Sequence, residues 1–177
     1  MRLFIAIGLS QEAKDHLFAL PKKIEGAKIR WTAKKNLHQT LKFFGEVDEK
    51  QLELIKNKLS TIKFKKFRAS LGNLGAFPNT TNARVIWVGM QPENIINKLQ
   101  LLIDELFLED FPSDTTFKSH LTIGRVKLLG RVNELKKFFD ETEIKDIEFD
   151  VEKFSLIKST LTSDGPKYRL IEEYDLV

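Results

Sequence analysis

Two copies of a short His-x-Thr segment constrain the fold of this chain more than any other feature of its sequence. The segments His38-Gln39-Thr40-Leu41 and His120-Leu121-Thr122-Ile123 begin 82 residues apart, close to half of the 177 residues. Each segment is predicted to be a strand, and a helix is expected about ten residues after the first and about thirteen after the second. A strand–helix unit that recurs at half the chain length predicts two related lobes.

The rest of the chain alternates between strand and helix patterns. The expected strands cover residues 2–8, 37–47, 67–71, 84–89, 121–129, 147–156 and 168–176, and the expected helices cover 11–25, 49–62, 92–109 and 133–141. The apolar phase slips near Glu152 and Lys153, which predicts a β-bulge there. This order of elements is typical of an α+β fold with helices packed on antiparallel sheets. We treat 1–177 as one bilobal domain.

Local signals mark several of the expected boundaries. Ser10 can cap the first helix, and Pro21 can interrupt it. Asp48 followed three residues later by Gln51 resembles a capping box for the second helix. Pro92 suits the first position of the third helix, whose apolar stripe is expected to comprise Ile95, Leu99, Leu102, Ile103 and Leu106. A long turn is predicted after residue 71 from Gly72, Gly75, Pro78 and Asn79.

Composition limits the chemistry that this protein can perform. The chain has no cysteine and three histidines, which excludes disulfides, thiol nucleophiles and thiolate-bound metals. Residues 1–70 hold 16 Lys and Arg against 7 Asp and Glu, whereas residues 71–177 hold 13 against 18. The basic half is compatible either with a solvated lysine-rich surface or with a face that attracts RNA or nucleotides. Apolar runs are too short to span a bilayer, so we expect a soluble, intracellular, cytoplasmic protein.

The two repeated segments offer the side chains of an acid–base pair. Residues i and i+2 of a strand share a face, so His38 projects with Thr40 and His120 with Thr122. Histidine titrates near neutral pH, and one imidazole can accept a proton while the other donates one. Threonine hydroxyls can bind phosphate oxygens, and the set suits displacement at phosphorus without a metal. A strand histidine is more often structural, and His16, on a polar helix, is interpreted as a surface residue.

Three segments of the sequence resemble the signatures of a known family. They are Arg2–Ile7, His38–Glu46 with Phe-Gly near its end, and His120–Val126 with Gly-Arg. These segments are similar to those of the 2H phosphoesterase superfamily, and within it to the RNA 2',3'-cyclic phosphodiesterase branch, also known as 2'-5' RNA ligase-like. The resemblance covers essentially the whole chain.

The resemblance implies a bilobal fold of two pseudo-symmetric lobes with antiparallel sheets, outer helices and a cleft that holds both motifs. It implies hydrolysis of a terminal 2',3'-cyclic phosphate of RNA to a 2'-phosphate, without a metal or cofactor. By the same resemblance His38 is the proton donor and His120 the proton acceptor, and Thr40, Thr122 and Arg125 bind the phosphate. The implied partner is RNA or an oligonucleotide with a cyclic phosphate end, and nothing in the sequence requires a membrane or a protein partner.

Five further residues near the motifs have open roles. Arg125 lies at an odd offset from His120, so a regular strand would turn it away unless a bulge or twist at Gly124 redirects it. Lys42 is expected on the face of His38, most simply as an exposed lysine, although a contact with the substrate backbone is an alternative. Phe4 and Phe43 are interpreted as core residues rather than as platforms for bases. Tyr168 receives no catalytic role.

Two other functions fit the same sequence. The site could work in reverse and join cyclic-phosphate and 5'-hydroxyl RNA ends through a 2'-5' bond, without ATP because no adenylylation lysine motif or nucleotide-binding glycine loop is present. Alternatively, the chain could be an RNA- or nucleotide-binding module that never turns over. The basic half supports the binding module, and the two intact motifs favour an enzyme.

Overall fold

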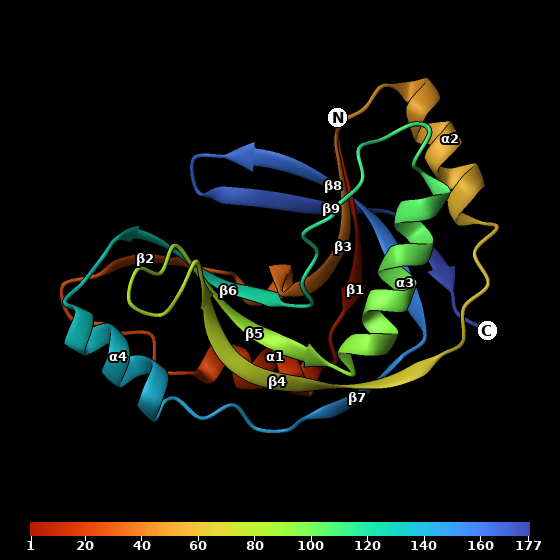
Figure 1. Cartoon of the computed structure of the whole chain (residues 1–177). Helices are drawn as coiled ribbons and strands as arrows, with labels where there is room; N and C mark the ends of the chain where they lie inside the picture. The colour runs from red at the N-terminus through yellow and green to blue at the C-terminus, as the bar shows by residue number, and fades with distance from the viewer.

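A single antiparallel β-sheet of nine strands runs through the whole molecule (Figure 1). The computed structural model describes all 177 residues. The strands are β1 (Arg2–Gly8), β2 (Lys28–Trp31), β3 (His38–Glu46), β4 (Phe67–Phe77), β5 (Val85–Gln91), β6 (Leu121–Leu128), β7 (Glu148–Val151), β8 (Lys153–Thr162) and β9 (Gly165–Asp175). The helices are α1 (Gln11–Ala19), the short 3-10 helix η1 (Lys34–Asn36), α2 (Glu49–Leu59), α3 (Glu93–Leu106) and α4 (Val132–Glu141).

The expected two lobes are present, and they exchange strands. The sheet order is β7-β4-β5-β6-β3-β1-β8-β9. Strand β2 pairs with residues 124–128 of β6, beyond the single residue pair that β6 shares with β3. Strand β4, from the first half of the sequence, pairs with β7 from the second half, and β8 from the second half pairs with β1 from the first. The lobes meet where β3 and β6 share one residue pair, Gln39 with Leu121. Each lobe is thus built from both halves of the chain.

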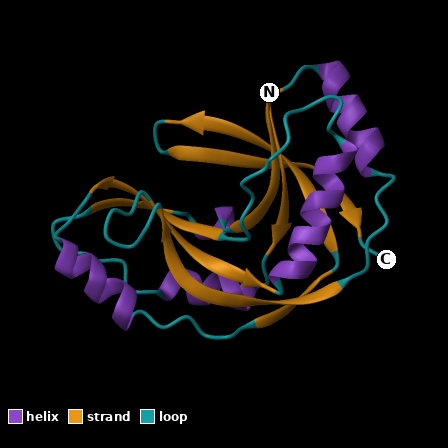
Figure 2. Cartoon of the chain, viewed as in Figure 1, coloured by secondary structure: helices purple, strands orange, loops and turns teal.

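The helices lie around the strongly curved sheet, as Figure 2 shows. Helices α2 and α3 stand together at one end of the molecule and α4 lies at the other (Figure 1). The core side of α3 is formed by Ile96, Leu99 and Ile103, all fully buried. The predicted stripe is therefore right at Leu99 and Ile103 but wrong at Leu102, which is 37% exposed.

Helix boundaries follow the local chemistry of the sequence with small corrections. Helix α1 ends at Ala19, two residues before Pro21, because proline cannot continue the hydrogen-bond ladder. The capping box is confirmed: Asp48 accepts a hydrogen bond from the Gln51 amide, and the Gln51 side chain accepts one from the Asp48 amide. Pro92 is the N-cap of α3 rather than its first helical residue.

The predicted long turn is right at Pro78 and Asn79, within the 78–84 connection, but wrong at Gly72 and Gly75, because β4 continues through both glycines to Phe77. Gly75 pairs with Trp87 of β5, and a Cβ on Gly75 would lie 2.4 Å from the indole ring. The glycine thus makes room for an aromatic side chain within the strand. Near Glu152 the predicted irregularity is a full interruption: β7 ends at Val151 on β4, and β8 begins at Lys153 on β9 and continues along β1.

Candidate active site

A cleft of about 470 Å³ lies between the lobes, and every side chain that the motifs predicted for the site lines it. These side chains are His38, Thr40, His120, Thr122 and Arg125. The β8–β9 hairpin contributes Asp164, Gly165, Pro166 and Tyr168 to the lining of the cleft, and in Figure 1 it projects toward the same end of the molecule as β2. The Asn36 amide group donates a hydrogen bond to the carbonyl oxygen of Pro166, 3.0 Å away, and so ties the hairpin to the start of β3. The cleft therefore joins the two motifs, as expected.

His38 is held in one orientation by hydrogen bonds at both ring nitrogens. Its Nδ1 lies 2.6 Å from the carbonyl oxygen of Asn36, and its Nε2 lies 2.8 Å from the Thr40 hydroxyl. A carbonyl oxygen only accepts, so Nδ1 carries the proton and Nε2 of the neutral ring accepts from Thr40. The ring packs against Phe4 at a centroid distance of 4.9 Å and edge-on against Tyr168 at 5.3 Å. The Nε2 nitrogen is thus the one free to exchange a proton.

His120 is held by the same device in the other half of the chain. It lies directly before β6, and its Nδ1 is 2.6 Å from the carbonyl oxygen of Lys118, again two residues earlier. Its ring meets Phe77 edge-on at 5.0 Å, and the Trp87 ring lies 6.4 Å away. The two motifs therefore fix the same tautomer, with Nδ1 protonated and Nε2 available.

Burial disfavours the protonated, charged form of both histidines. It lowers the pKa of His38 from 6.5 to about 4, although the hydrogen bond to Asn36 acts in the opposite direction. Burial also lowers the pKa of His120, and the charges of Arg125 and Lys118 lower it further. Both rings are therefore neutral in the free protein at pH 7.

A β-bulge follows each motif and resets which side chains enter the cleft. In the pairing of β3 with β1, the register skips one residue at Leu41, so Lys42 faces the core and Phe43 faces the cleft. In the pairing of β6 with β5, the register skips Ile123, so Arg125 faces the cleft with Thr122. The predicted redirection of Arg125 near Gly124 is confirmed.

The bulge in β3 corrects two expectations from the sequence. Lys42 is neither an exposed lysine nor a substrate contact: it is 2% exposed, because the phase change turns it away from the face of His38. Phe43 is not a core residue but is 67% exposed in the cleft, whereas Phe4 is buried as expected. Phe43 and Arg125 occupy equivalent positions, each five residues after its histidine.

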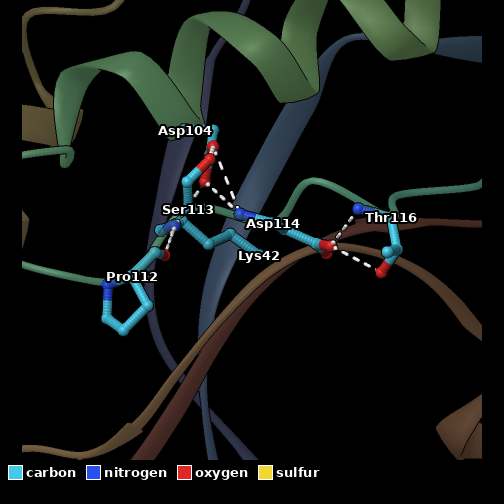
Figure 3. A network of polar contacts seen from close by, with 6 residues as sticks. All are labelled: Lys42, Asp104, Pro112, Ser113, Asp114 and Thr116. Carbon is cyan, nitrogen blue, oxygen red and sulfur yellow. Dashed lines mark hydrogen bonds and ion pairs between the residues drawn. The ribbon is translucent and has the colours of Figure 1, made fainter.

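Lys42 instead forms a buried ion pair that ties β3 to the segment before His120 (Figure 3). Its Nζ lies 2.5 Å from Oδ1 of Asp104 on α3 and donates to the carbonyl oxygen of Pro112 at 2.9 Å. Asp104 also accepts from the Ser113 hydroxyl at 2.5 Å and from the Asp114 amide. Burial alone would raise the pKa of Asp104, but these hydrogen bonds outweigh it and lower that pKa.

A second buried contact joins the motifs directly. The Ser119 hydroxyl lies 3.1 Å from the Met90 carbonyl oxygen and 3.3 Å from the side-chain oxygen of Gln39. Gln39 is fully buried between His38 and Thr40, and its amide group donates to the Thr40 carbonyl at 2.8 Å. The residues that flank both histidines are therefore locked together at the junction of the lobes.

Several cleft residues are not evident from the motifs. Arg2 of β1 and Arg30 of β2 line the cleft with Arg125, against one carboxylate, Asp164. Tyr168 contacts the rings of both His38 and Phe4. The only sequence signal for Arg2 was its place in the first signature segment. His16, interpreted as a surface residue, is half-buried in α1 and accepts a hydrogen bond from the Lys145 amide, outside the set of cleft residues.

The sequence and the fold are similar to those of known proteins. The family model described as LigT like Phosphoesterase matches twice, over residues 7–87 and 88–168. The chain belongs to the LigT-like phosphoesterase family. The two matches correspond to the two motif-bearing halves of this LigT-like chain.

Individual relatives agree along the full length. The chain is 34% identical over 175 residues to the RNA 2',3'-cyclic phosphodiesterase of Methanocaldococcus jannaschii, with 98% of this chain and 100% of the relative covered. It is 32% identical to the protein of the same name from Thermotoga maritima, over 98% of this chain and 94% of that one. A crystal structure from Thermus thermophilus superimposes with a TM-score of 0.78 at 29% identity, covering 99% of this chain and 97% of that one. No helix of this LigT-like protein is long and apolar enough to cross a membrane.

Proposed function

We propose that this protein hydrolyses the terminal 2',3'-cyclic phosphate of RNA to a 2'-phosphate, without a metal, by a two-histidine acid–base mechanism. The observation that carries the proposal is the pair of imidazoles in one arginine-lined cleft, each with Nδ1 fixed by a backbone carbonyl, so that Nε2 is the nitrogen that exchanges protons. Similarity to relatives named RNA 2',3'-cyclic phosphodiesterase supports the substrate class.

The reaction needs one proton acceptor and one proton donor. Water attacks phosphorus and gives a proton to Nε2 of His120. The bond from phosphorus to the 3' oxygen breaks, and this oxygen takes a proton from Nε2 of His38, which leaves a 2'-phosphate and a 3'-hydroxyl. Thr40, Thr122 and Arg125 bind the non-bridging oxygens, where negative charge accumulates in the transition state. The assignment of donor and acceptor follows the family resemblance.

The low pKa of His38 adds one requirement to this assignment. A ring with a pKa of about 4 is neutral in the free protein at pH 7 and cannot act as a donor until it gains a proton. The substrate phosphate is an anion, and an anion beside an imidazole raises its pKa. The charge of the substrate therefore favours the protonated form of His38, and transfer of that proton to the 3' oxygen returns the ring to the neutral form.

The direct test is product analysis with a defined oligonucleotide that ends in a 2',3'-cyclic phosphate. Wild-type protein is expected to yield only the 2'-phosphate, in the presence or absence of a chelator. His38→Ala and His120→Ala are each expected to lower the rate at least about 100-fold, because each removes one general acid or base. A matched control is His16→Ala, which changes the third histidine, outside the cleft. Full activity in either cleft variant, or loss of wild-type activity with the chelator, would refute the mechanism.

The same assay ranks the alternatives. A second oligonucleotide with a 5'-hydroxyl end is included without ATP. A dominant 2'-5'-joined product would make ligation the main activity of the site. Intact cyclic phosphate after prolonged incubation at high protein concentration, despite measurable binding, would identify a binding module instead.

A further inference from the structure

Strand β2, which the sequence pattern did not predict, brings a second arginine face to face with Arg125. In the antiparallel pairing of β2 with β6, Arg30 and Arg125 are direct cross-strand partners. Both side chains are exposed and line the cleft, and neither forms an ion pair. Like charges directly opposite on a sheet destabilise it, because nothing offsets their repulsion. An anionic ligand between or beside them would remove that cost.

The two guanidinium groups serve different parts of the cleft. Arg125 lines the cleft together with His120 and Thr122, beside the reaction centre, and its charge lowers the pKa of His120. The guanidinium carbon of Arg30 lies 4.0 Å from the position that a Cβ would occupy on Gly165, at the tip of the β8–β9 hairpin. Gly165 is buried with a φ of +118°, so the hairpin turns tightly where the arginine reaches it. Arg30 therefore lies in the part of the cleft that the hairpin tip borders.

An RNA end offers two kinds of anion to such a pair. The first is the cyclic phosphate, which under the proposed function lies at the histidines and Arg125. The second is the phosphodiester that joins the terminal nucleotide to its 5' neighbour. A guanidinium group binds phosphate oxygens through two parallel hydrogen bonds and is well suited to such a contact.

We propose that Arg30 binds the phosphodiester on the 5' side of the terminal nucleotide and thereby makes the protein selective for oligonucleotides over cyclic mononucleotides. The proposal rests on the proposed function, because it takes the cyclic phosphate at the histidines as its fixed point. Asp164, the one carboxylate of the cleft, forms no ion pair with Arg30, so the arginine is available to this phosphate.

The first experiment compares kcat/KM for adenosine 2',3'-cyclic phosphate and for the dinucleotide ApA with the same cyclic end. We expect wild-type protein to prefer the dinucleotide by about 10- to 100-fold, the worth of one charge-assisted contact. Arg30→Gln should reduce this ratio to near one, and Arg30→Lys should restore part of it. The matched control is Arg169→Gln, at an exposed arginine of β9 outside the cleft, which should keep the full ratio.

The second experiment changes the substrate at the atom in question. A dinucleotide whose internal phosphodiester is a neutral methylphosphonate should lose the wild-type preference, and Arg30→Gln should not distinguish it from the normal dinucleotide. If Arg2→Gln instead abolishes this difference while Arg30→Gln keeps it, Arg2 is the contact and the proposal is wrong. Equal use of mononucleotide and dinucleotide by wild-type protein also overturns it. Failure to hydrolyse either substrate would refute the proposed function itself.

Discussion

Burial lowers the pKa of His38, and this predicts that the free energy of unfolding decreases in acid. The unfolded chain has an ordinary histidine of pKa 6.5, whereas the folded chain holds that group at about 4. Between these two pKa values the unfolded chain binds a proton at His38 and the folded protein does not, so the free energy of unfolding falls as the pH falls. At about 1.36 kcal/mol per pKa unit, His38 alone removes about 2 kcal/mol between pH 7.5 and pH 5, and about 3 kcal/mol by pH 4.

The substitution His38→Gln isolates this contribution. A glutamine amide can still donate to the Asn36 carbonyl but does not titrate. Urea denaturation of both proteins from pH 7.5 to pH 4 should show two curves that converge or cross as the pH falls, with the difference shifting by about 2 kcal/mol at pH 5 in favour of the variant. His16 and His120 remain in both proteins, so their titration largely cancels.

Parallel curves would refute the reasoning. They would mean that His38 takes up a proton in the folded protein as readily as in the unfolded chain. There would then be no reason to require that the substrate anion raise the pKa of His38 before it can donate a proton.

Three further substitutions test contacts that stabilise the fold, each by urea denaturation. Lys42→Met leaves the Asp104 carboxylate buried without its partner and should lower the free energy of unfolding by about 3–5 kcal/mol. Adding Asp104→Leu should recover most of that loss. Equal instability of the double variant would contradict the ion-pair explanation. Gly75→Ala forces a methyl group against Trp87 and should cost about 1–3 kcal/mol, whereas an unchanged midpoint would show that the ring moves freely. Asp48→Ala removes the capping box and should lower the free energy of unfolding by about 1 kcal/mol. Because the cap lies outside the cleft, kcat/KM should not change, and a loss of activity would contradict this separation of cap and site.

The sequence predicted well wherever the information is local. The period of two along a strand placed His38 with Thr40 on one face, and both line the cleft. The cap at Asp48 and the end of α1 before Pro21 depend on contacts within a few residues, and short-range sterics and hydrogen bonds decide them.

Expectations were wrong where a distant strand decided the outcome. The bulge that buries Lys42 and exposes Phe43 exists only in the pairing of β3 with β1, and no property of the segment itself marks it. Strand β2 is only four residues long, too short for a sequence pattern to establish, and its pairing with β6 is what makes it a strand. Its Arg30 could not be assigned to the cleft before that pairing was known.

By itself, the sequence determined the chemistry available to this protein: two histidines with hydroxyl neighbours, repeated at half the chain length, and no thiol. Those features are carried by residue type and spacing, which need no third dimension. Only the tertiary structure decided which arginines and aromatic rings surround the histidines and how far burial suppresses their charge. These properties arise where strands from both halves of the chain pair and exclude water, and such contacts join residues such as Gln39 and Ser119 that lie 80 positions apart.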